Sequence, residues 1–444
     1  MKMYLSAKDT GYLHSEVRMS GAPTGAPAVE ADSGTVYQTL LGFGGAFTEA
    51  AAVTFAKMGA ANQGRILEMY FDREKGLGYA LGRIAIASSD FAEGMYDYLD
   101  GEDPALKSFD ISREERAVFP MIRAAMKKRG EPLRMLAAPW SPPAFMKDTK
   151  TRKHGGRLMP EFYCAYARYL VRYIVEARES AIPVEWLSVQ NEPDAKQTWD
   201  SCLYTAGEER DFVKSALGPA LRDAGLDDMK LLIHDHNRDI LLERALCILG
   251  DPEAAGFIWG TAIHWYLCEE FGESTKLHEA HPDKHILFTE GCVEGGPAPG
   301  SWENGERYAR NIIGDLNNWV EGWVDWNLVL DAQGGPNHAG NLCCAPILCD
   351  TETDALTINP SYHFIGHFAK HIKPGAKRIA HLSGVPTLKT LTAQNPDGSI
   401  VLVALNETDM AQPFSMSIDG VRAGAELPPR SIATVSGVSR GRFS

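Results

Sequence analysis

The sequence predicts an α/β protein, a (β/α)8 TIM barrel with an appended all-β side sandwich, from two observations. Through the middle of the chain, short apolar runs alternate with longer stretches of helical periodicity, the pattern of βα units around a parallel sheet. From about residue 376 the pattern becomes all-β, with Val401, Val403 and Leu405 alternating with their neighbours. We therefore predict N-terminal strands that join the sandwich over residues 1–39, a barrel over 40–375 and the C-terminal sandwich over 376–444.

Eight apolar runs are the candidate barrel strands, since buried parallel strands carry little charge. One intervening helix begins near Pro160, which suits a first helical turn, and continues with apolar side chains at three- and four-residue steps. Another helix runs over 120–128 and ends at Gly130, a residue suited to a left-handed cap. The candidate strands are 40–44, 81–87, 133–137, 184–189, 231–233, 261–263, 285–288 and 322–326.

Composition narrows the function classes. Of the 444 residues 44% are apolar and 23% charged, which is ordinary for a globular protein, and no apolar run approaches the ~18 residues of a transmembrane helix. The net charge of −14 makes nucleic acid and anionic membranes poor partners. The eight cysteines form no Cys-x-x-Cys pair, and no secretory signal opens the chain. We expect reduced thiols, a cytoplasmic location unless a leader was removed, no cofactor, no metal and no integral membrane association; the oligomeric state is open.

Polar and aromatic residues follow nearly every candidate strand. In this type of barrel the active site lies at the C-terminal ends of the strands, so these residues are expected to line one pocket. They are Ser88-Ser89-Asp90-Phe91, Pro139-Trp140-Ser141, Gln190-Asn191-Glu192-Pro193, His234-Asp235-His236-Asn237, His264-Trp265-Tyr266, Thr289-Glu290-Gly291 and Trp326-Asn327.

Two of these residues, Glu192 and Glu290, end the fourth and seventh strands and should face each other across the barrel mouth. Paired carboxylates without a metal cluster suit glycoside hydrolysis, in which one carboxyl donates a proton and the other attacks the sugar. Burial and the neighbouring negative charge are expected to raise the pKa of the donor. Aromatic residues at the same rim suit the C–H face of a sugar; they are Trp140, Trp265, Tyr266 and Trp326.

The chain resembles glycoside hydrolase family 30, the family of lysosomal glucosylceramidase. The resemblance is collinear over about the whole length. The matching motifs are Gly42-Phe43-Gly44-Gly45-Ala46-Phe47-Thr48-Glu49, Ala87-Ser88-Ser89-Asp90-Phe91, Ala138-Pro139-Trp140-Ser141-Pro142-Pro143, Asn191-Glu192-Pro193, His264-Trp265-Tyr266, Thr289-Glu290-Gly291-Cys292, Asp325-Trp326-Asn327-Leu328, Gly334-Gly335-Pro336-Asn337 and Tyr362-His363-Phe364-Ile365-Gly366-His367-Phe368.

The resemblance implies a retaining O-glycosyl β-glycosidase (EC 3.2.1.-) with a glycosyl-enzyme intermediate. Glu192 would be the general acid/base and Glu290 the nucleophile, with carboxyl groups about 5–5.5 Å apart. The resemblance also implies a cis peptide bond between Trp326 and Asn327. The other residues carried over are Asn191 on the sugar 2-hydroxyl, Asp90, Phe91, Trp140 and Trp326 around the sugar, Asn341 at the edge of that subsite, and His264 and Tyr266 beside the nucleophile.

The leaving-group side departs from the lysosomal enzyme in the loops 267–276 and 295–304 and at the end of the fifth strand. Candidate residues on this side are His234, His236, Trp265 and Trp302. An exo β-glucosidase or glucosylceramidase-like activity is the first expectation. A β-xylosidase, a β-fucosidase and a β-1,6-glucanase of the same family are the alternatives.

Two rival interpretations come from other classes. A barrel metallohydrolase could use His234, His236 and His264, although the His234–Asn237 run is typical of a loop that enters a helix. A catalytically inactive sugar-binding module is the second. Cys292 could be a thiol nucleophile, but no Cys/His spacing supports it, so we interpret Cys292, like Cys343 and Cys344, as buried packing.

Overall fold

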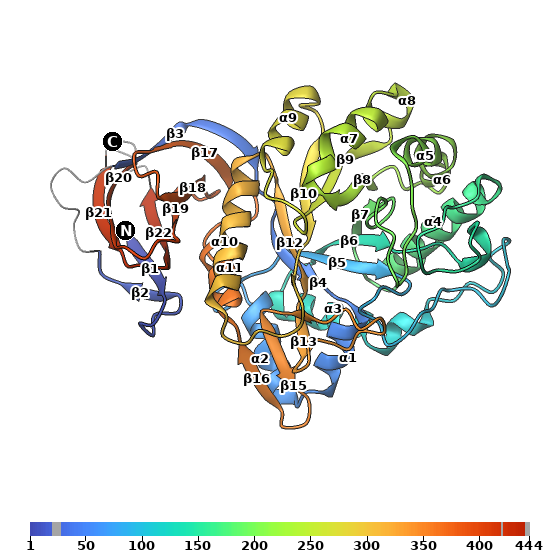
Figure 1. Ribbon diagram of the computed structural model, residues 1–444, viewed down its shortest axis with the longest axis horizontal. Coiled ribbons are helices and arrows are strands. Elements are labelled where there is room, and N and C mark those ends of the chain that lie inside the picture. Colours follow the sequence, from blue (N-terminus) through green and yellow to red (C-terminus); the bar gives the residue numbers. More distant parts are fainter. Residues whose placement is uncertain (20–27, 419–420, 440–444) are drawn as a thin grey trace.

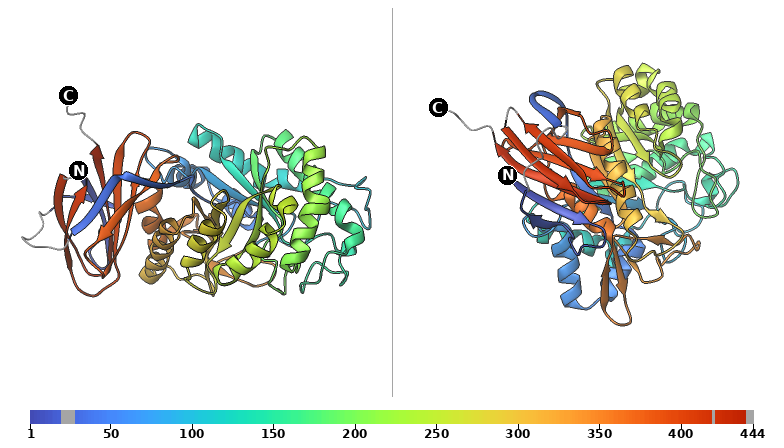
Figure 2. Two further views of the ribbon diagram at one scale, coloured as in Figure 1. Left: turned by 90° about the horizontal axis from the view of Figure 1, so that it is seen from above. Right: turned by 60° about the vertical axis from the view of Figure 1, so that its left-hand side comes forward.

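A computed structural model describes residues 1–19, 28–418 and 421–439. Its two parts are a closed barrel of parallel strands surrounded by helices and a β-sandwich at one side (Figure 1; Figure 2). The predicted fold class is confirmed. Residues 20–27, 419–420 and 440–444, which belong to the predicted sandwich segments, lie outside the described residues. None of the helices that the structure describes is long and apolar enough to cross a bilayer.

All eight candidate strands are present, and they close the barrel in the order β10-β12-β4-β5-β6-β7-β8-β9. One prediction at the end of β8 is wrong: the segment from His234 to Asn237 continues the strand and is not a loop. A register shift between Ile233 and His236 bends the strand there. The strands are β4 Gly42–Ala46, β5 Leu81–Ile86, β6 Arg134–Pro139, β7 Val184–Ser188, β8 Lys230–Asn237, β9 Ile258–His264, β10 His285–Glu290 and β12 Gly322–Asn327.

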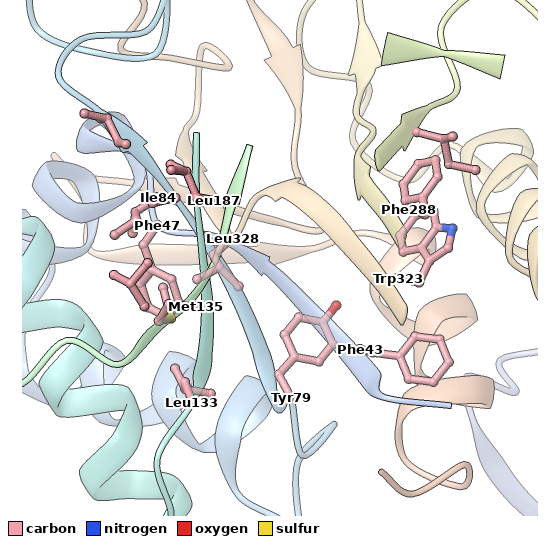
Figure 3. Close-up of a cluster of buried hydrophobic side chains, with 14 of the residues drawn as sticks. Phe43, Phe47, Tyr79, Ile84, Leu133, Met135, Leu187, Phe288, Trp323 and Leu328 are labelled. Atoms are coloured by element: carbon pink, nitrogen blue, oxygen red, sulfur yellow. The ribbon is translucent and has the colours of Figure 1, made fainter. Parts of the chain in front are cut away.

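The barrel strands are apolar because both of their faces are buried. Along β10, Leu287 points into the barrel, whereas Ile286 and Phe288 pack against the surrounding helices. Phe288 stacks on Trp323 of β12 at a centroid distance of 4.2 Å (Figure 3). Successive side chains of a strand point to opposite faces, so each apolar strand buries one set of side chains inside the barrel and the other under the helices. The polar residues at the strand ends lie beyond these apolar runs, at the barrel mouth.

The helices cover the barrel from outside. Gly130 adopts φ 77° and closes α3, as its position predicted, and a 3-10 turn over Pro160–Phe162 precedes α4. The helices are α1 Glu49–Lys57, α2 Ala60–Phe71, α3 Val118–Arg129, α4 Tyr163–Glu179, α5 Ala206–Phe212, α6 Gly218–Asp223, α7 Leu241–Leu249, α8 Pro252–Ala255, α9 Gly272–Ala280, α10 Trp302–Asn317 and α11 Pro360–Ala369.

The sandwich joins both ends of the chain in one nine-stranded sheet, in the order β2-β1-β22-β19-β18-β17-β3-β20-β21. On β19, Ile400, Leu402 and Ala404 face the core of the sandwich, while Val401 and Val403 belong to the core shared with α10 and α11. The strands are β1 Lys2–Ala7, β2 Ser15–Val17, β3 Ala28–Thr39, β17 Lys377–Ser383, β18 Leu388–Gln394, β19 Ser399–Asn406, β20 Gln412–Ile418, β21 Val421–Leu427 and β22 Ser431–Ser439.

Two small sheets extend the loops at the barrel mouth. β11 (Val293–Glu294) pairs with β14 (Cys343–Cys344) beside the end of β10. β13 (Val329–Asp331), β15 (Ile347–Asp350) and β16 (Ala355–Ile358) form the other sheet. The β11–β14 pair therefore fixes the loop after Glu290 against the loop after β12.

Candidate active site

A cavity of about 450 Å³ opens at the C-terminal ends of the barrel strands. It brings together most of the site residues predicted from the sequence. Those that line it are Asp90, Phe91, Trp140, Glu192, His236, Tyr266, Glu290, Trp326 and Asn341. Asn237, from the predicted run at the end of β8, also lines the cavity. The lining residues that were not predicted from the sequence are Asp194, Ala195, Lys196, Gln197, Trp199, Leu267, Cys292, Glu294 and Cys343.

The two predicted carboxylates meet in this cavity. Glu290 is the last residue of β10, and Glu192 lies in the turn after β7 with a left-handed backbone at φ 47°. The backbone N–H of Glu192 donates to the carbonyl of Asp235 at 3.0 Å, which holds this strained turn in place. One carboxylate oxygen of Glu192 lies within 4.8 Å of one of Glu290. Both side chains can thus reach the same bond of a substrate.

Glu290 is held on one oxygen and open on the other. The Tyr266 hydroxyl donates to Oε1 at 2.8 Å. Oε2 is buried and accepts no hydrogen bond, and Nη1 of Arg83 lies 3.4 Å from it. A carboxylate with one fixed oxygen and one free oxygen beside a cation has the geometry of an attacking nucleophile.

Arg83, on β5, organises the floor of the site and was missed by the sequence analysis. It is fully buried, and its guanidinium donates to the carbonyl of Thr289 at 2.8 Å, to Oδ1 of Asn191 at 2.6 Å and to Oδ2 of Asp235 at 3.0 Å. One cation thus ties the residues next to both glutamates into a single network. A positive charge inside an otherwise apolar strand run was the available signal, because a buried charge needs a partner.

His264 lies between the acidic groups. Its Nδ1 is 3.3 Å from Oε1 of Glu192, and its Nε2 is 3.0 Å from Oδ1 of Asp235. Burial would lower the pKa of His264, but the negative charges of Glu290, Asp235 and Glu192 raise the pKa to about 9. The ring is therefore an imidazolium at neutral pH.

The pKa values of the two glutamates diverge. Burial would raise the pKa of Glu192, but the hydrogen bond and charge of His264 outweigh it, and the pKa lies below its usual range. Burial raises the pKa of Glu290 to about 7 against the charges of His264 and Arg83, and the negative charge of Glu192 adds to this rise. The raised pKa was expected at the proton donor, which the resemblance makes Glu192. In the structure the raised pKa lies at Glu290, because the His264 imidazolium contacts Glu192 directly.

Aromatic rings and a carboxylate form the facing wall. Trp140 stacks on Trp326 at 5.2 Å, and the Arg83 guanidinium lies 5.2 Å from the Trp140 ring centroid. The Asp90 carboxylate accepts hydrogen bonds from the side-chain amides of Asn337 at 3.1 Å and Asn341 at 3.0 Å. Burial nevertheless raises the pKa of Asp90 to about 6.

Three residues predicted for the leaving-group side do not line this cavity. Nε2 of His234 is 2.9 Å from the Asn237 carbonyl, and its ring is fully buried. The indole of Trp265 donates to the carbonyl of Cys292 at 3.1 Å and packs on Tyr308, behind the wall. Trp302 packs against Phe364 on the outside of the barrel. The bend in β8 turns His234 away from the cavity while His236 remains in its lining.

This placement also argues against the metallohydrolase interpretation. Within residues 1–19, 28–418 and 421–439, the three side chains close enough to share an ion are Glu192, His264 and Glu290, not the three histidines of that hypothesis. His264 directs both ring nitrogens at carboxylates, and with its pKa near 9 it keeps no lone pair for a cation at neutral pH. The donor chemistry of this group suits proton transfer better than metal binding.

The expected cis bond between Trp326 and Asn327 is also wrong for this structure. In the described part of the chain the cis peptide bond is Gly335–Pro336. Trp326 nevertheless lines the cavity, and β12 has a register shift between Asp325 and Asn327 where it pairs with β4.

Comparison with known proteins agrees with this geometry. The Glycosyl hydrolase family 30 TIM-barrel domain matches residues 40–372, and the family 30 beta sandwich domain matches residues 375–435. The chain belongs to glycoside hydrolase family 30. It is therefore a glycoside hydrolase, and the resemblance noted in the sequence is confirmed.

Named relatives and solved structures are similar to this chain over most of its length. Putative glucosylceramidase 4 of Caenorhabditis elegans is 34% identical over 95% of this chain and 85% of its own length. Lysosomal acid glucosylceramidase of Mus musculus is 34% identical over 86% of this chain and 77% of its own. The crystal structure of SrfJ from Salmonella typhimurium has a TM-score of 0.94 at 35% identity and covers 99% of both chains. The endo-β1,6-glucanase BT3312 has a TM-score of 0.87 at 26% identity and covers 98% of both.

Proposed function

We propose that this family 30 glycoside hydrolase is a retaining β-glycosidase that works by double displacement and that it acts as an exo β-glucosidase of the glucosylceramidase kind. The observation that carries the mechanism is the separation of at most 4.8 Å between carboxylate oxygens of Glu192 and Glu290. Retaining enzymes hold their two carboxyl groups about 5–5.5 Å apart, whereas inverting enzymes leave about 6.5–9.5 Å for a water molecule.

In the first step Oε2 of Glu290 forms a bond to the anomeric carbon while the bond to the leaving oxygen breaks. Glu192 gives its proton to that oxygen, so the leaving alcohol departs neutral. The site holds one proton on the carboxylate pair below pH 7, since the pKa of Glu290 is about 7. When substrate is bound, its glycosidic oxygen accepts a hydrogen bond from protonated Glu192, which favours the proton on Glu192. Arg83 and Tyr266 then stabilise the charged form of Glu290.

In the second step Glu192, now ionised, takes a proton from water as the water oxygen attacks the anomeric carbon. The ester bond to Glu290 breaks, and the carboxylate returns to its contacts with Tyr266 and Arg83. Two inversions at one carbon give a product with the β configuration of the substrate.

The terminal sugar would lie between Glu290 and the wall of Trp140, Trp326 and Phe91. The Asp90 carboxylate, fixed by Asn341, would accept hydrogen bonds from sugar hydroxyls. Oδ1 of Asn191 is occupied by Arg83, so its amide nitrogen is the group offered to the 2-hydroxyl. On the leaving-group side we place His236, with Lys196, Gln197 and Trp199 among its neighbours in the lining.

Glucose as the sugar is supported by the relatives named glucosylceramidase. A β-1,6-glucanase activity is the second candidate, favoured by the TM-score of 0.87 with the endo-β1,6-glucanase BT3312. A panel of nitrophenyl β-glucoside, β-xyloside and β-fucoside together with a β-1,6-glucan separates these activities. Release of nitrophenol from the glucoside alone supports the first candidate, and depolymerisation of the glucan supports the second.

The roles of the two glutamates are tested separately. A 2-deoxy-2-fluoro-β-glucoside inactivator should label Glu290, which peptide mapping would locate; a label at Glu192 would exchange the two roles. The variant Glu192→Ala should regain turnover with azide and release a β-glycosyl azide. Absence of azide rescue would remove Glu192 from the acid/base role.

A further inference from the structure

Two thiols from different loops touch in the cavity wall. Sγ of Cys292 donates a hydrogen bond to Sγ of Cys343, and the two sulfurs are 3.1 Å apart. Both cysteines are at least 95% buried, yet both belong to the cavity lining next to Glu290 and Tyr266. The proposed glycosidase mechanism uses neither thiol, so the contact between them is not explained by catalysis.

The backbone holds the two cysteines together. Cys292 directly precedes β11, Cys343 begins β14, and these strands pair antiparallel with Val293 opposite Cys344. Cys292 and Cys343 are therefore diagonal neighbours across one strand pair. Cys344 is differently placed: its sulfur accepts a hydrogen bond from the Asn359 amide at 3.5 Å. The pairing of β11 with β14 thus places Cys343, and not Cys344, beside Cys292.

We propose that Cys292 and Cys343 are a redox modification site, which a two-electron oxidant of the peroxide class closes into a disulfide that lowers the activity of the enzyme. A disulfide bond is about 2.05 Å long, so the sulfurs need to approach by only about 1 Å. Hydrogen peroxide can enter through the open cavity that the thiols line. The two sulfurs are therefore already in contact before oxidation.

The reaction balances without a further reactant. One thiolate sulfur attacks a peroxide oxygen, the O–O bond breaks, and a sulfenic acid and one water form. The second sulfur then attacks the sulfenic sulfur and releases the second water. Two thiols lose two electrons and two protons in total, and one peroxide is reduced to two waters. The hydrogen bond to Cys343 and burial raise the pKa of the Cys292 thiol well above its usual value, so the reaction should be slow at neutral pH and speed up as the pH rises.

The effect on activity arises from the groups that Cys292 touches; this part rests on the proposed function. Its sulfur lies 3.7 Å from the hydroxyl of Tyr266, which donates to Glu290. Cys292 is also only two residues beyond Glu290 in the chain. A shift of about 1 Å at a positioned catalytic group can cost about 100-fold in rate. We expect closure to lower kcat/KM at least tenfold and dithiothreitol to restore it.

The test uses the full chain, fully reduced and then treated with hydrogen peroxide. Mass spectrometry should find a loss of two hydrogens and a linked peptide that carries Cys292 and Cys343, in parallel with the loss of activity. The exposed Cys164 and Cys247 report whether the peroxide has reacted. The variant Cys343→Ala should keep its own activity through the same treatment, whereas the matched control Cys344→Ala should lose it as the parent does.

Three other outcomes overturn the proposal in whole or in part. If Cys164 and Cys247 become oxidised while no peptide links Cys292 to Cys343, the pair is not a disulfide site. If Cys343→Ala loses activity on oxidation as the parent does, the inhibition arises elsewhere. A linked peptide without a change in activity removes the regulatory part. If the reduced protein hydrolyses no glycoside, the proposed function fails. The presence or absence of the linked peptide still decides whether Cys292 and Cys343 form a disulfide.

Discussion

The Tyr266 hydroxyl donates a 2.8 Å hydrogen bond to Oε1 of Glu290 and leaves Oε2 without a hydrogen-bond partner. The bond fixes the direction of the carboxylate and stabilises its charged form. Tyr266 reaches this position because it lies two residues beyond the end of β9, the barrel neighbour of β10. Orientation of the nucleophile is thus a consequence of adjacent strands in one barrel.

Removal of that hydroxyl should slow the reaction without loss of the fold. A hydrogen bond to a charged group contributes about 1.5–3 kcal/mol, so Tyr266→Phe should lower kcat roughly ten- to hundredfold and change KM little. Because the bond lowers the pKa of Glu290, its loss should move the alkaline limb of the pH profile upward. The control Tyr308→Phe removes a buried hydroxyl that donates to Asp325 at 2.7 Å and should spare kcat. Equal losses in both variants would contradict the positioning role.

The proton shared by the carboxylates should set the alkaline limit of activity. The raised pKa of Glu290, about 7, means that the pair keeps one proton below this pH and loses it above. Proton donation needs that proton, so kcat/KM should fall tenfold per unit as pH rises beyond about 7. A pH series with an aryl glycoside measures this, with a structural probe to exclude unfolding. A profile that stays flat to pH 9 would be inconsistent with a shared proton.

The buried Arg83–Asp235 pair should matter for stability as well as for the site. Both side chains are fully buried and 3.0 Å apart. Arg83→Met leaves Asp235 without its cation, and removal of one partner of a buried pair costs about 3–5 kcal/mol. The partly exposed Arg134, paired with Glu185, is the matched control, and Arg134→Met should cost less than about 1 kcal/mol. Denaturant unfolding compares the two; similar losses would show that burial of the pair has no special role.

Features carried by a local pattern could be predicted from the sequence, and features set by tertiary contacts could not. All eight barrel strands and the glutamates at the ends of β7 and β10 were visible as apolar runs with polar residues after them. The role of Arg83 could not be predicted, because its hydrogen-bond partners come from three other strands or loops and no local sequence pattern identifies them. The bend at His234 depends on strand register, and the position of Trp265 behind the wall depends on its contact with Tyr308 of α10.

A histidine cluster at the junction of β1, β2 and α11 predicts acid sensitivity. Burial lowers the pKa of His14 to about 4, of His371 to about 2, and of His367 well below its usual range. Below the usual value of about 6.5 the unfolded chain binds protons that the folded chain excludes, so stability should fall on acidification by about 1.4 kcal/mol per pH unit for each histidine. His367→Asn should reduce this slope between pH 6 and 5. An unchanged slope in His367→Asn would remove His367 from this account.

The anomeric form of the first product tests the central claim most directly. Proton NMR recorded in the first minutes of hydrolysis of a β-glucoside distinguishes the two anomers before they interconvert. Carboxylates within 4.8 Å predict that the β-anomer appears first and that the α-anomer grows in later by mutarotation. Initial release of the α-anomer would show a single displacement and contradict the glycosyl-enzyme on Glu290.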